Sequence, residues 1–233
     1  MKKEITQSGI PFDPNYFEDL SKKGVTKEIK DVFTFIFETN HWQGSDSVSG
    51  AGSDYAQTVA VAEALPSLLA AHSIKTMLDL PCGDFLWMSQ LNLPLEQYIG
   101  ADIVNSLITH HQQTYTSPAR QFQVIDLTKD SLPEVDLIFC RDCLVHLSFD
   151  DIRKVFQNLV SSNIQYILTT TFTDRTENKD IITGDWRTLN LQTAPFNLPA
   201  PIAVINEQCT EGNGAYADKS MALWEVKVLT GML

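Results

Sequence analysis

Apolar residues recur along this chain with two different periods, and the change of period divides it into two parts. Near the N-terminus the spacing is three and four residues, which predicts an amphipathic helix. Its apolar stripe consists of Ile29, Val32, Phe33, Ile36 and Phe37. We expect residues 1–39 to form a helical N-terminal extension. Residues 40–53, rich in glycine and serine, predict a loop.

A second helix is predicted over residues 55–71, which are rich in alanine and leucine. Asp54 precedes this stretch and is a candidate N-cap. Pro66 lies inside it and could kink the helix or divide it in two.

From residue 75 onward, short apolar runs alternate with helical stretches. The strands predicted from these runs are residues 76–80, 97–103, 122–127, 135–140 and 165–172. Helices are expected at residues 85–91 and 104–115, and another from near Asp150. Such alternation indicates parallel strands covered on both faces. The predicted fold is therefore α/β, a Rossmann-like doubly wound sheet with mostly parallel strands.

The last third of the chain departs from this alternation. Residues 173–199 are polar and proline-rich at their end, which suggests an insert that serves as a lid or substrate wall. Residues 202–208 and 220–229 are predicted to be strands joined by a turn, forming a C-terminal antiparallel hairpin. We expect one globular unit, with residues 1–54 as helical extension and lid loop and 55–233 as the Rossmann-like domain.

Charge and hydropathy narrow the range of partners. The chain has 29 acidic and 17 basic residues, a formal net charge of −12, which disfavours a nucleic-acid partner. No apolar run reaches the roughly 18 residues of a membrane span. The N-terminal lysines are followed by polar residues rather than a signal-peptide core. We therefore expect a cytoplasmic protein without a membrane partner, and the oligomeric state stays open.

The four cysteines do not form a recognisable framework. Cys140 and Cys143 form a C-x-x-C pair, which is compatible with redox chemistry or half of a zinc site. A zinc site needs a second pair, and Cys82 and Cys209 are isolated from each other. Buried, reduced thiols and no metal are the favoured interpretation.

The loop after the first predicted strand is a candidate ligand anchor. It runs from Asp79 through Gly83 to Phe85, and ligands of open α/β sheets bind at such carboxyl ends. Gly83 lets the backbone come close to a ligand. The pyrophosphate-binding pattern G-x-G-x-x-G is absent, which disfavours a dinucleotide-dependent oxidoreductase.

Two further acids follow the next strands, Asp102 after residues 97–101 and Asp126 within VIDL. Together with DLPCGDF, they resemble the motifs of class I S-adenosylmethionine-dependent methyltransferases. The resemblance implies that Gly83 lies at the methionine part of the cofactor, that Asp102 binds the ribose, and that Asp126 reads the adenine. The cofactor site that it implies comprises Trp42, Ser53, Asp79, Pro81, Cys82, Gly83, Asp84, Asp102, Ile103, Asp126, Leu127 and Arg141.

The segment CRDCLVHLSF resembles the part of these enzymes that lines the methyl-transfer centre. A hydroxyl acceptor requires a base, and His146, about one helical turn beyond Asp142, is the candidate. Asp142 could orient His146, assist directly, or contact the cofactor. The alternative is that His146 only packs beneath a helix. A magnesium site would need Asp142, Asp174 and Asp185 to converge, which we do not expect.

The acceptor pocket is expected between the loop 42–53 and the insert 173–199. Trp42 and Trp186 offer flat faces, and Arg175 and Arg187 could bind an anion. The segments NHWQGSDSVSGAGS, GDWRTLNLQTAPFNLPAP and DKSMALWEV also resemble a narrower bacterial subgroup of these methyltransferases.

These patterns lead to a hypothesis of O-methylation of a sugar, glycan or other small molecule. The alternative is a non-catalytic S-adenosylmethionine-binding or scaffold protein of the same fold.

Overall fold

A single sheet forms the centre of the protein. The computed structural model describes residues 12–232, and within them the sheet has seven strands in the order β3-β2-β1-β4-β5-β7-β6. The strands are β1 (Thr76–Asp79), β2 (Gln97–Asp102), β3 (Arg120–Val124), β4 (Leu137–Cys140), β5 (Tyr166–Phe172), β6 (Ala203–Asn206) and β7 (Lys219–Glu225). Strands β1 to β5 are parallel, and β7 pairs antiparallel with β5 and β6. The predicted fold class, including the C-terminal hairpin, is confirmed.

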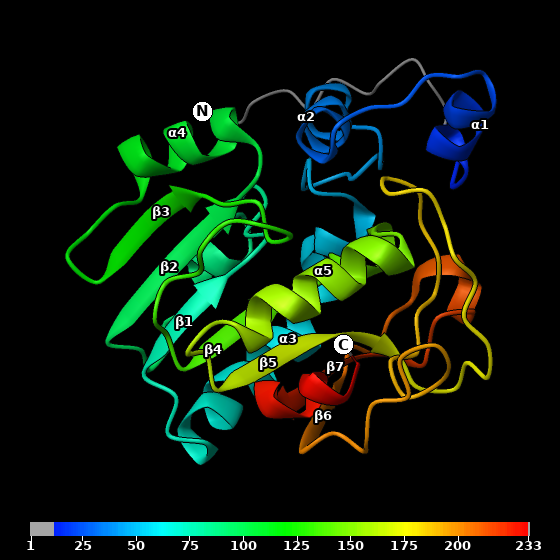
Figure 1. Ribbon diagram of the computed structural model, residues 1–233. Helices are drawn as coiled ribbons and strands as arrows, with labels where there is room; N and C mark the ends of the chain where they lie inside the picture. The colour runs from blue at the N-terminus through cyan, green and yellow to red at the C-terminus, as the bar shows by residue number, and fades with distance from the viewer. Residues whose placement is uncertain (1–11, 233) are drawn as a thin grey trace.

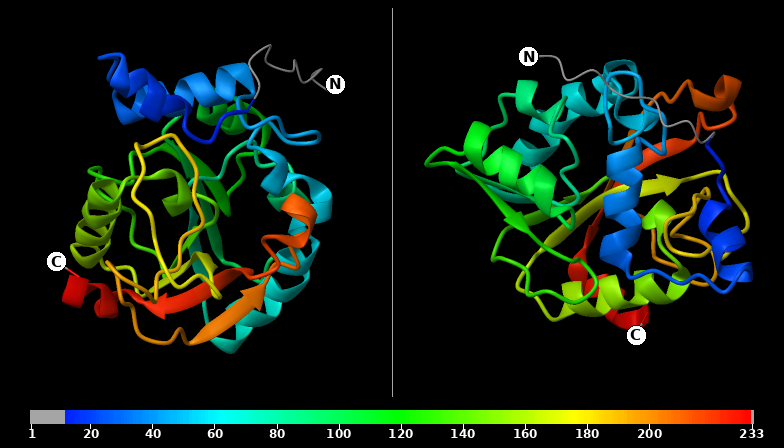
Figure 2. Two further views of the ribbon diagram at one scale, coloured as in Figure 1. Left: turned by 90° about the vertical axis from the view of Figure 1, so that its right-hand side faces the viewer. Right: turned by 90° about the horizontal axis from the view of Figure 1, so that it is seen from above.

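Helices cover both faces of this sheet. Within the described residues the α-helices are α1 (Tyr16–Lys22), α2 (Ile29–Thr39), α3 (Tyr55–Ala71), α4 (Asn105–Thr114) and α5 (Phe149–Val160). Figure 1 shows α5 in front of the sheet and α3 behind it, and Figure 2 shows the same layers from the side. All four residues of β4 are buried, as continuous apolar runs predict for a covered parallel strand. Pro66 neither ends nor divides α3.

Three predicted elements differ from the observed ones. The stretch 85–91 forms only the short 3-10 turn η2 (Met88–Gln90), because Gly83 and Phe85 take left-handed φ angles of 52° and 60°. Strand β3 ends at Val124, before the turn in which Asp126 accepts the backbone N–H of Thr128. The last predicted strand ends at Glu225 and continues as the 3-10 helix η5 (Val226–Met232).

The N-terminal helices lie above the carboxyl ends of the parallel strands (Figure 1). The predicted helical extension includes residues 1–11, which lie outside the described residues. Helix α1 is held by the insert 173–199, since the carboxylate of Asp185 accepts the backbone N–H groups of Phe17 at 2.7 Å and Glu18 at 2.9 Å. The insert therefore supports helix α1, one of the two helices above the carboxyl ends of the strands. Within the described residues, no helix is long and apolar enough to cross a membrane.

Candidate functional site

One cavity opens at the carboxyl ends of β1 to β4, beneath α2 and the loop 40–53. Every residue predicted for cofactor contact lines it, together with Asp142. These residues are Trp42, Ser53, Asp79, Pro81, Cys82, Gly83, Asp84, Asp102, Ile103, Asp126, Leu127 and Arg141. The topology thus brings loops that are far apart in the sequence to one place.

Part of the wall was not foreseen as functional. Ile29, Phe33 and Phe37 of α2 line the cavity, while Val32 and Ile36 of the same stripe are buried in the N-terminal cluster. The stripe therefore serves two surfaces. The sequence signal for this second surface is the width of the apolar stripe of α2 and its phenylalanines, because a helix that packs against one neighbour needs only a narrower stripe.

The glycine loop is held rigidly in place. The N–H of Gly83 donates to Oδ2 of Asp102 at 3.2 Å, and its carbonyl oxygen lies 2.7 Å from Nε2 of His111. A β-carbon at Gly83 would lie 2.3 Å from Oγ of Ser49, so this position is closed to any side chain. His111, on α4, is a supporting residue that no sequence motif indicated.

Two buried carboxyl groups at the cavity titrate near neutral pH. Burial raises the pKa of Asp79 to about 7, although its Oδ2 accepts a hydrogen bond of 2.5 Å from the hydroxyl of Tyr98. Burial also raises the pKa of Asp102 to about 6, against the N–H groups of Val104 and Gly83 that favour its ionised form. A cation bound beside these two groups would favour their ionisation.

Asp126 behaves differently. Burial opposes its ionisation, but hydrogen bonds from Thr128 and the ammonium of Lys129 at 3.1 Å together hold its pKa below the usual range. It is therefore a carboxylate at neutral pH, placed after β3 beside Leu127.

The loop 40–53 is tied to the glycine loop. Oδ2 of Asp84 accepts hydrogen bonds from Oγ of Ser47 at 2.9 Å and from the N–H of Val48 at 3.1 Å. The N–H of Asp84 donates to Oγ of Ser49 at 2.9 Å. This loop, which we call the lid loop, therefore closes one side of the cavity.

Asp54 organises the lid loop rather than capping α3. It stands at the N-cap position without a side-chain capping bond. Its carboxylate instead accepts the backbone N–H groups of Ser45, Asp46 and Ser47. The predicted cap is wrong because three loop N–H groups compete for the same oxygens.

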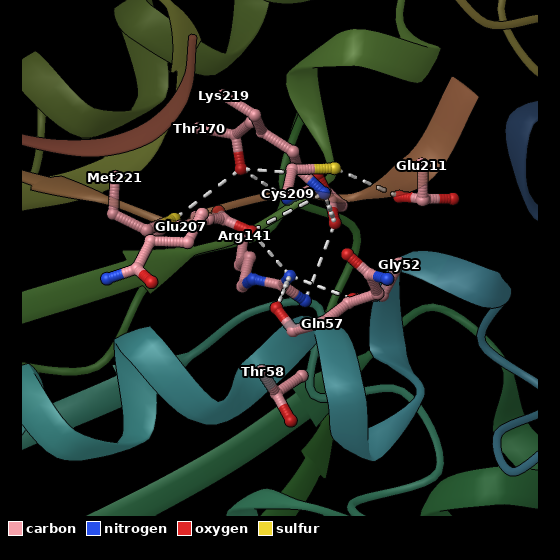
Figure 3. Close-up of polar contacts among 12 residues, drawn as sticks. Gly52, Gln57, Thr58, Arg141, Thr170, Glu207, Cys209, Glu211, Lys219 and Met221 are labelled. Atoms are coloured by element: carbon pink, nitrogen blue, oxygen red, sulfur yellow. Dashed lines mark hydrogen bonds and ion pairs between the residues drawn. The ribbon is translucent and has the colours of Figure 1, made fainter. Parts of the chain in front are cut away.

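Two cations and two anions form a buried cluster at one wall of the cavity, which we call the four-charge cluster. It consists of Arg141, Asp142, Glu207 and Lys219. Figure 3 labels three of its members, Arg141, Glu207 and Lys219. The guanidinium of Arg141 contacts Glu207 at 2.6 Å and Asp142 at 3.5 Å, and Lys219 contacts Asp142 at 2.7 Å and Glu207 at 3.5 Å. Glu207, which lies 66 residues further along the chain, is a partner of Arg141 that no sequence motif indicated.

His146 does not line the cavity. Its ring stacks on Trp42 at a centroid distance of 4.1 Å, and its Nδ1 lies 2.9 Å from the carbonyl oxygen of Asp185. Burial lowers the pKa of His146 to about 4. The expected position of a catalytic base is therefore not observed, because the segment after β4 turns as the 3-10 helix η3 (Leu144–His146) and directs the ring to the insert.

Residues expected at the acceptor side are also engaged elsewhere. Arg175 pairs with Asp218 at 2.6 Å, and Arg187 donates to the carbonyl oxygens of Leu144 and Leu147. Neither they nor Trp186 lines the cavity. Among the described residues, no three His, Cys, Asp or Glu side chains converge as a metal site, so Asp142, Asp174 and Asp185 stand apart. The four cysteines are free thiols.

No protein-family model matches the sequence, and no curated protein matches it. Solved structures do match. N-methyltransferase NodS from Bradyrhizobium japonicum WM9, in complex with S-adenosyl-L-homocysteine, has a TM-score of 0.60 at 13% identity, over 82% of this chain and 97% of NodS. Human N-acetylserotonin methyltransferase, in complex with SAM, has a TM-score of 0.53 at 16% identity, over 88% of this chain and 61% of that one.

The methyltransferase domain of bacterial CtHen1 has a TM-score of 0.44 at 15% identity. The match covers 49% of this chain and 66% of that one, just under two thirds of its length. At these identities the likeness concerns the fold alone. The chain shares the Rossmann-like fold of the matched methyltransferases, in agreement with the predicted fold class.

Proposed function

We propose that this protein is an S-adenosylmethionine-dependent methyltransferase that acts on a small polar acceptor. The observation that carries the proposal is the convergence of Asp79, Asp102 and Asp126 with the Gly83 loop in one cavity. The matched NodS and N-acetylserotonin methyltransferase structures hold S-adenosylhomocysteine and S-adenosylmethionine, which supports the choice of ligand.

The charge of the cavity fits this cofactor. Among the described residues, it is lined by a single cation, Arg141, and by the acids Asp79, Asp84, Asp102, Asp126 and Asp142. S-adenosylmethionine carries a sulfonium and an ammonium, and when bound it would supply an electrophilic methyl group. An acid-lined, partly buried site favours such a cation over the phosphates of a dinucleotide.

Each part of the cavity has a role in holding the cofactor. The resemblance assigns the ribose hydroxyls to Asp102 and the adenine to Asp126 and the backbone of Leu127. Gly83 leaves space where a side chain would intrude. Phe33 and Phe37 of α2 and Trp42 of the lid loop exclude water from above, which strengthens the electrostatic contacts inside.

A non-catalytic cofactor-binding protein is the second candidate, because His146 lies behind Trp42 rather than at the cavity. The sequence suggests a sugar or glycan hydroxyl as the acceptor, and such a hydroxyl would need a general base at the cavity. The two candidates differ in turnover. Release of S-adenosylhomocysteine with a methylated product supports the enzyme, and cofactor binding without turnover on sugars, phenols and amines supports the scaffold.

The cofactor proposal predicts a specific binding pattern. Isothermal titration should show S-adenosylmethionine and S-adenosylhomocysteine binding, and no binding of NAD. Replacing Asp102 by alanine should weaken both by about 1–3 kcal/mol, because a charge-assisted hydrogen bond is lost. Asp150→Asn, at a carboxylate with 84% side-chain exposure on α5, is the control and should bind as the wild type does. Unchanged affinity in Asp102→Ala would contradict the ribose assignment.

The raised pKa values predict that cofactor affinity depends on pH. Asp102 and Asp79 have pKa values of about 6 and 7 without ligand, and a cation binds best when both are ionised. Affinity should therefore rise from pH 5 to pH 7.5, by at most about tenfold per pH unit for each group that must lose its proton. In the ligand-free protein these two carboxyls contribute the opposite trend to stability: their contribution falls as pH rises from about 4 to about 7, because the same carboxyls ionise first in the unfolded chain, whereas buried His146, with its lowered pKa, contributes in the reverse direction. Cofactor titrations and urea unfolding across this range measure both, and a flat affinity profile would contradict the prediction.

A further inference from the structure

Asp142 presents a carboxylate to the cavity at the end of β4. Its side chain is 22% exposed, and its φ angle is 50°. Oδ2 is engaged by the ammonium of Lys219 at 2.7 Å and the guanidinium of Arg141 at 3.5 Å. Among residues 12–232, the only group in contact with Oδ1 is the hydroxyl of Thr170, at a long distance of 3.4 Å. One oxygen of this carboxylate therefore retains capacity to accept a hydrogen bond from a ligand.

The four-charge cluster keeps Asp142 ionised. Burial opposes its ionisation, but the charges of Lys219 and Arg141 outweigh burial and hold its pKa well below the usual range. Lys219 is itself buried, yet Asp142 and Glu207 raise its pKa, so the ammonium also persists. A carboxylate with so low a proton affinity is a poor base and a good partner for positive charge.

The other described carboxylates at the cavity are engaged by groups of the protein itself: Asp102 accepts hydrogen bonds from the N–H groups of Gly83 and Val104, and Asp126 is bound by Thr128 and Lys129. His146 lies behind Trp42, and Asp79 accepts the hydroxyl of Tyr98. Asp84 accepts hydrogen bonds from the lid loop, and burial raises the pKa of the Cys82 thiol. An alcohol needs a base in the transition state, whereas a neutral amine attacks with its own lone pair.

We propose, resting on the proposed function, that the methyl acceptor is an amine whose nitrogen lies against Asp142, and that Lys219 is the positioning residue for that carboxylate. The nitrogen lone pair forms the new bond to the methyl carbon while the carbon–sulfur bond breaks and sulfur keeps its electron pair. The positive charge moves to nitrogen, beside Asp142, and the extra N–H proton passes to water after transfer. The C-terminal hairpin, which supplies Lys219, thereby takes part in acceptor choice.

Cofactor analogues test this without knowledge of the acceptor. Sinefungin carries a protonated amine where S-adenosylmethionine carries the methylsulfonium, and S-adenosylhomocysteine is neutral there. We expect sinefungin to bind the wild type about tenfold more tightly than S-adenosylhomocysteine, because its protonated amine can donate a charge-assisted hydrogen bond to the carboxylate of Asp142. Asp142→Asn should remove this preference, and because Glu207 still pairs with Arg141 and Lys219, the affinity for S-adenosylhomocysteine should stay within about twofold.

Lys219 variants separate positioning from a general structural role. Lys219→Met should reduce the sinefungin preference and leave binding of S-adenosylhomocysteine in place, and Lys219→Arg should restore the preference. Asp150→Asn is the matched control for loss of a surface carboxylate. Thermal unfolding identifies any variant that fails to fold, and the wild-type comparison of the two analogues then decides.

The possible outcomes separate the two proposals. If none of the three adenosyl compounds binds, the proposed function fails. If S-adenosylhomocysteine binds and sinefungin gains nothing in the wild type, or Asp142→Asn weakens both equally, the amine inference alone is overturned. Methylation of alcohols but not of amines matched in shape would also overturn it.

Discussion

Replacing Arg141 by methionine is expected to lower the free energy of unfolding by about 3–5 kcal/mol, the cost of leaving a buried charge without its partner. The side chains of Arg141 and Glu207 are 4% and 1% exposed and lie 2.6 Å apart. Without the guanidinium, Glu207 keeps only Lys219 at 3.5 Å, and the carbonyl oxygen of Gly52 in the lid loop loses its donor at 2.8 Å. Urea unfolding measures the change.

A double variant distinguishes a lost pair from a lost side chain. Arg141→Met with Glu207→Met removes both charges and leaves the pair of Asp142 and Lys219 intact, so it should recover much of the lost stability. Arg153→Met removes an exposed pair with Asp150 and should cost about 0.5 kcal/mol or less. A loss in Arg141→Met no larger than that of Arg153→Met would show that the cluster does not stabilise the fold.

Replacing Gly83 by alanine is expected to cost about 2–4 kcal/mol, which combines a left-handed backbone angle with overpacking. Gly83 has a φ of 52°, and the added carbon would lie 2.3 Å from Oγ and 3.0 Å from Cβ of Ser49. Ser49 can move away only by giving up its hydrogen bond to the N–H of Asp84, which ties the lid loop to the glycine loop. Cofactor affinity should fall with stability.

The clash component can be isolated. Ser49→Gly removes the atoms that collide, together with the hydrogen bond to the N–H of Asp84. Measured against Ser49→Gly alone, Gly83→Ala should therefore cost only the backbone part of about 1–2 kcal/mol. Urea unfolding and isothermal titration of the single and double variants measure this. Gly231→Ala, at a glycine with open space around it, is the control for glycine substitution. An equal cost of Gly83→Ala with serine and with glycine at position 49 would show that Ser49 is not the obstacle.

Local patterns were informative where one segment suffices to form an element. The stripe of Ile29 and Phe33 predicted α2, and the buried run 135–140 predicted β4, because periodic burial is a property of consecutive residues. The order of acids after successive strands also indicated the cavity, since parallel strands bring their carboxyl ends to one edge. The helix predicted from residue 85 does not form. Phe85, whose ring is buried, has a left-handed backbone conformation that a helix cannot accommodate.

The position of His146 depends on tertiary contacts that its local sequence does not predict. A spacing of one helical turn from Asp142 suggested a shared face, but the segment between them folds as a 3-10 turn and Trp42 covers the ring. The ion pair between Arg141 and Glu207 could not be predicted from the sequence either, because Glu207 belongs to the C-terminal hairpin, 66 residues further along the chain. Such contacts depend on how the insert and the hairpin pack against the sheet.

The sequence by itself determined the alternation of strands and helices, the glycine loop and the carboxylates that follow the parallel strands. These follow from periodicity and from the geometry common to parallel sheets. Only the tertiary structure decided which charges pair, which residue covers the cavity and which side chains line it. Pairing and burial are long-range properties. The ionisation state of Asp142, for example, depends on Lys219, 77 residues further along the chain, and on the burial of both side chains away from water.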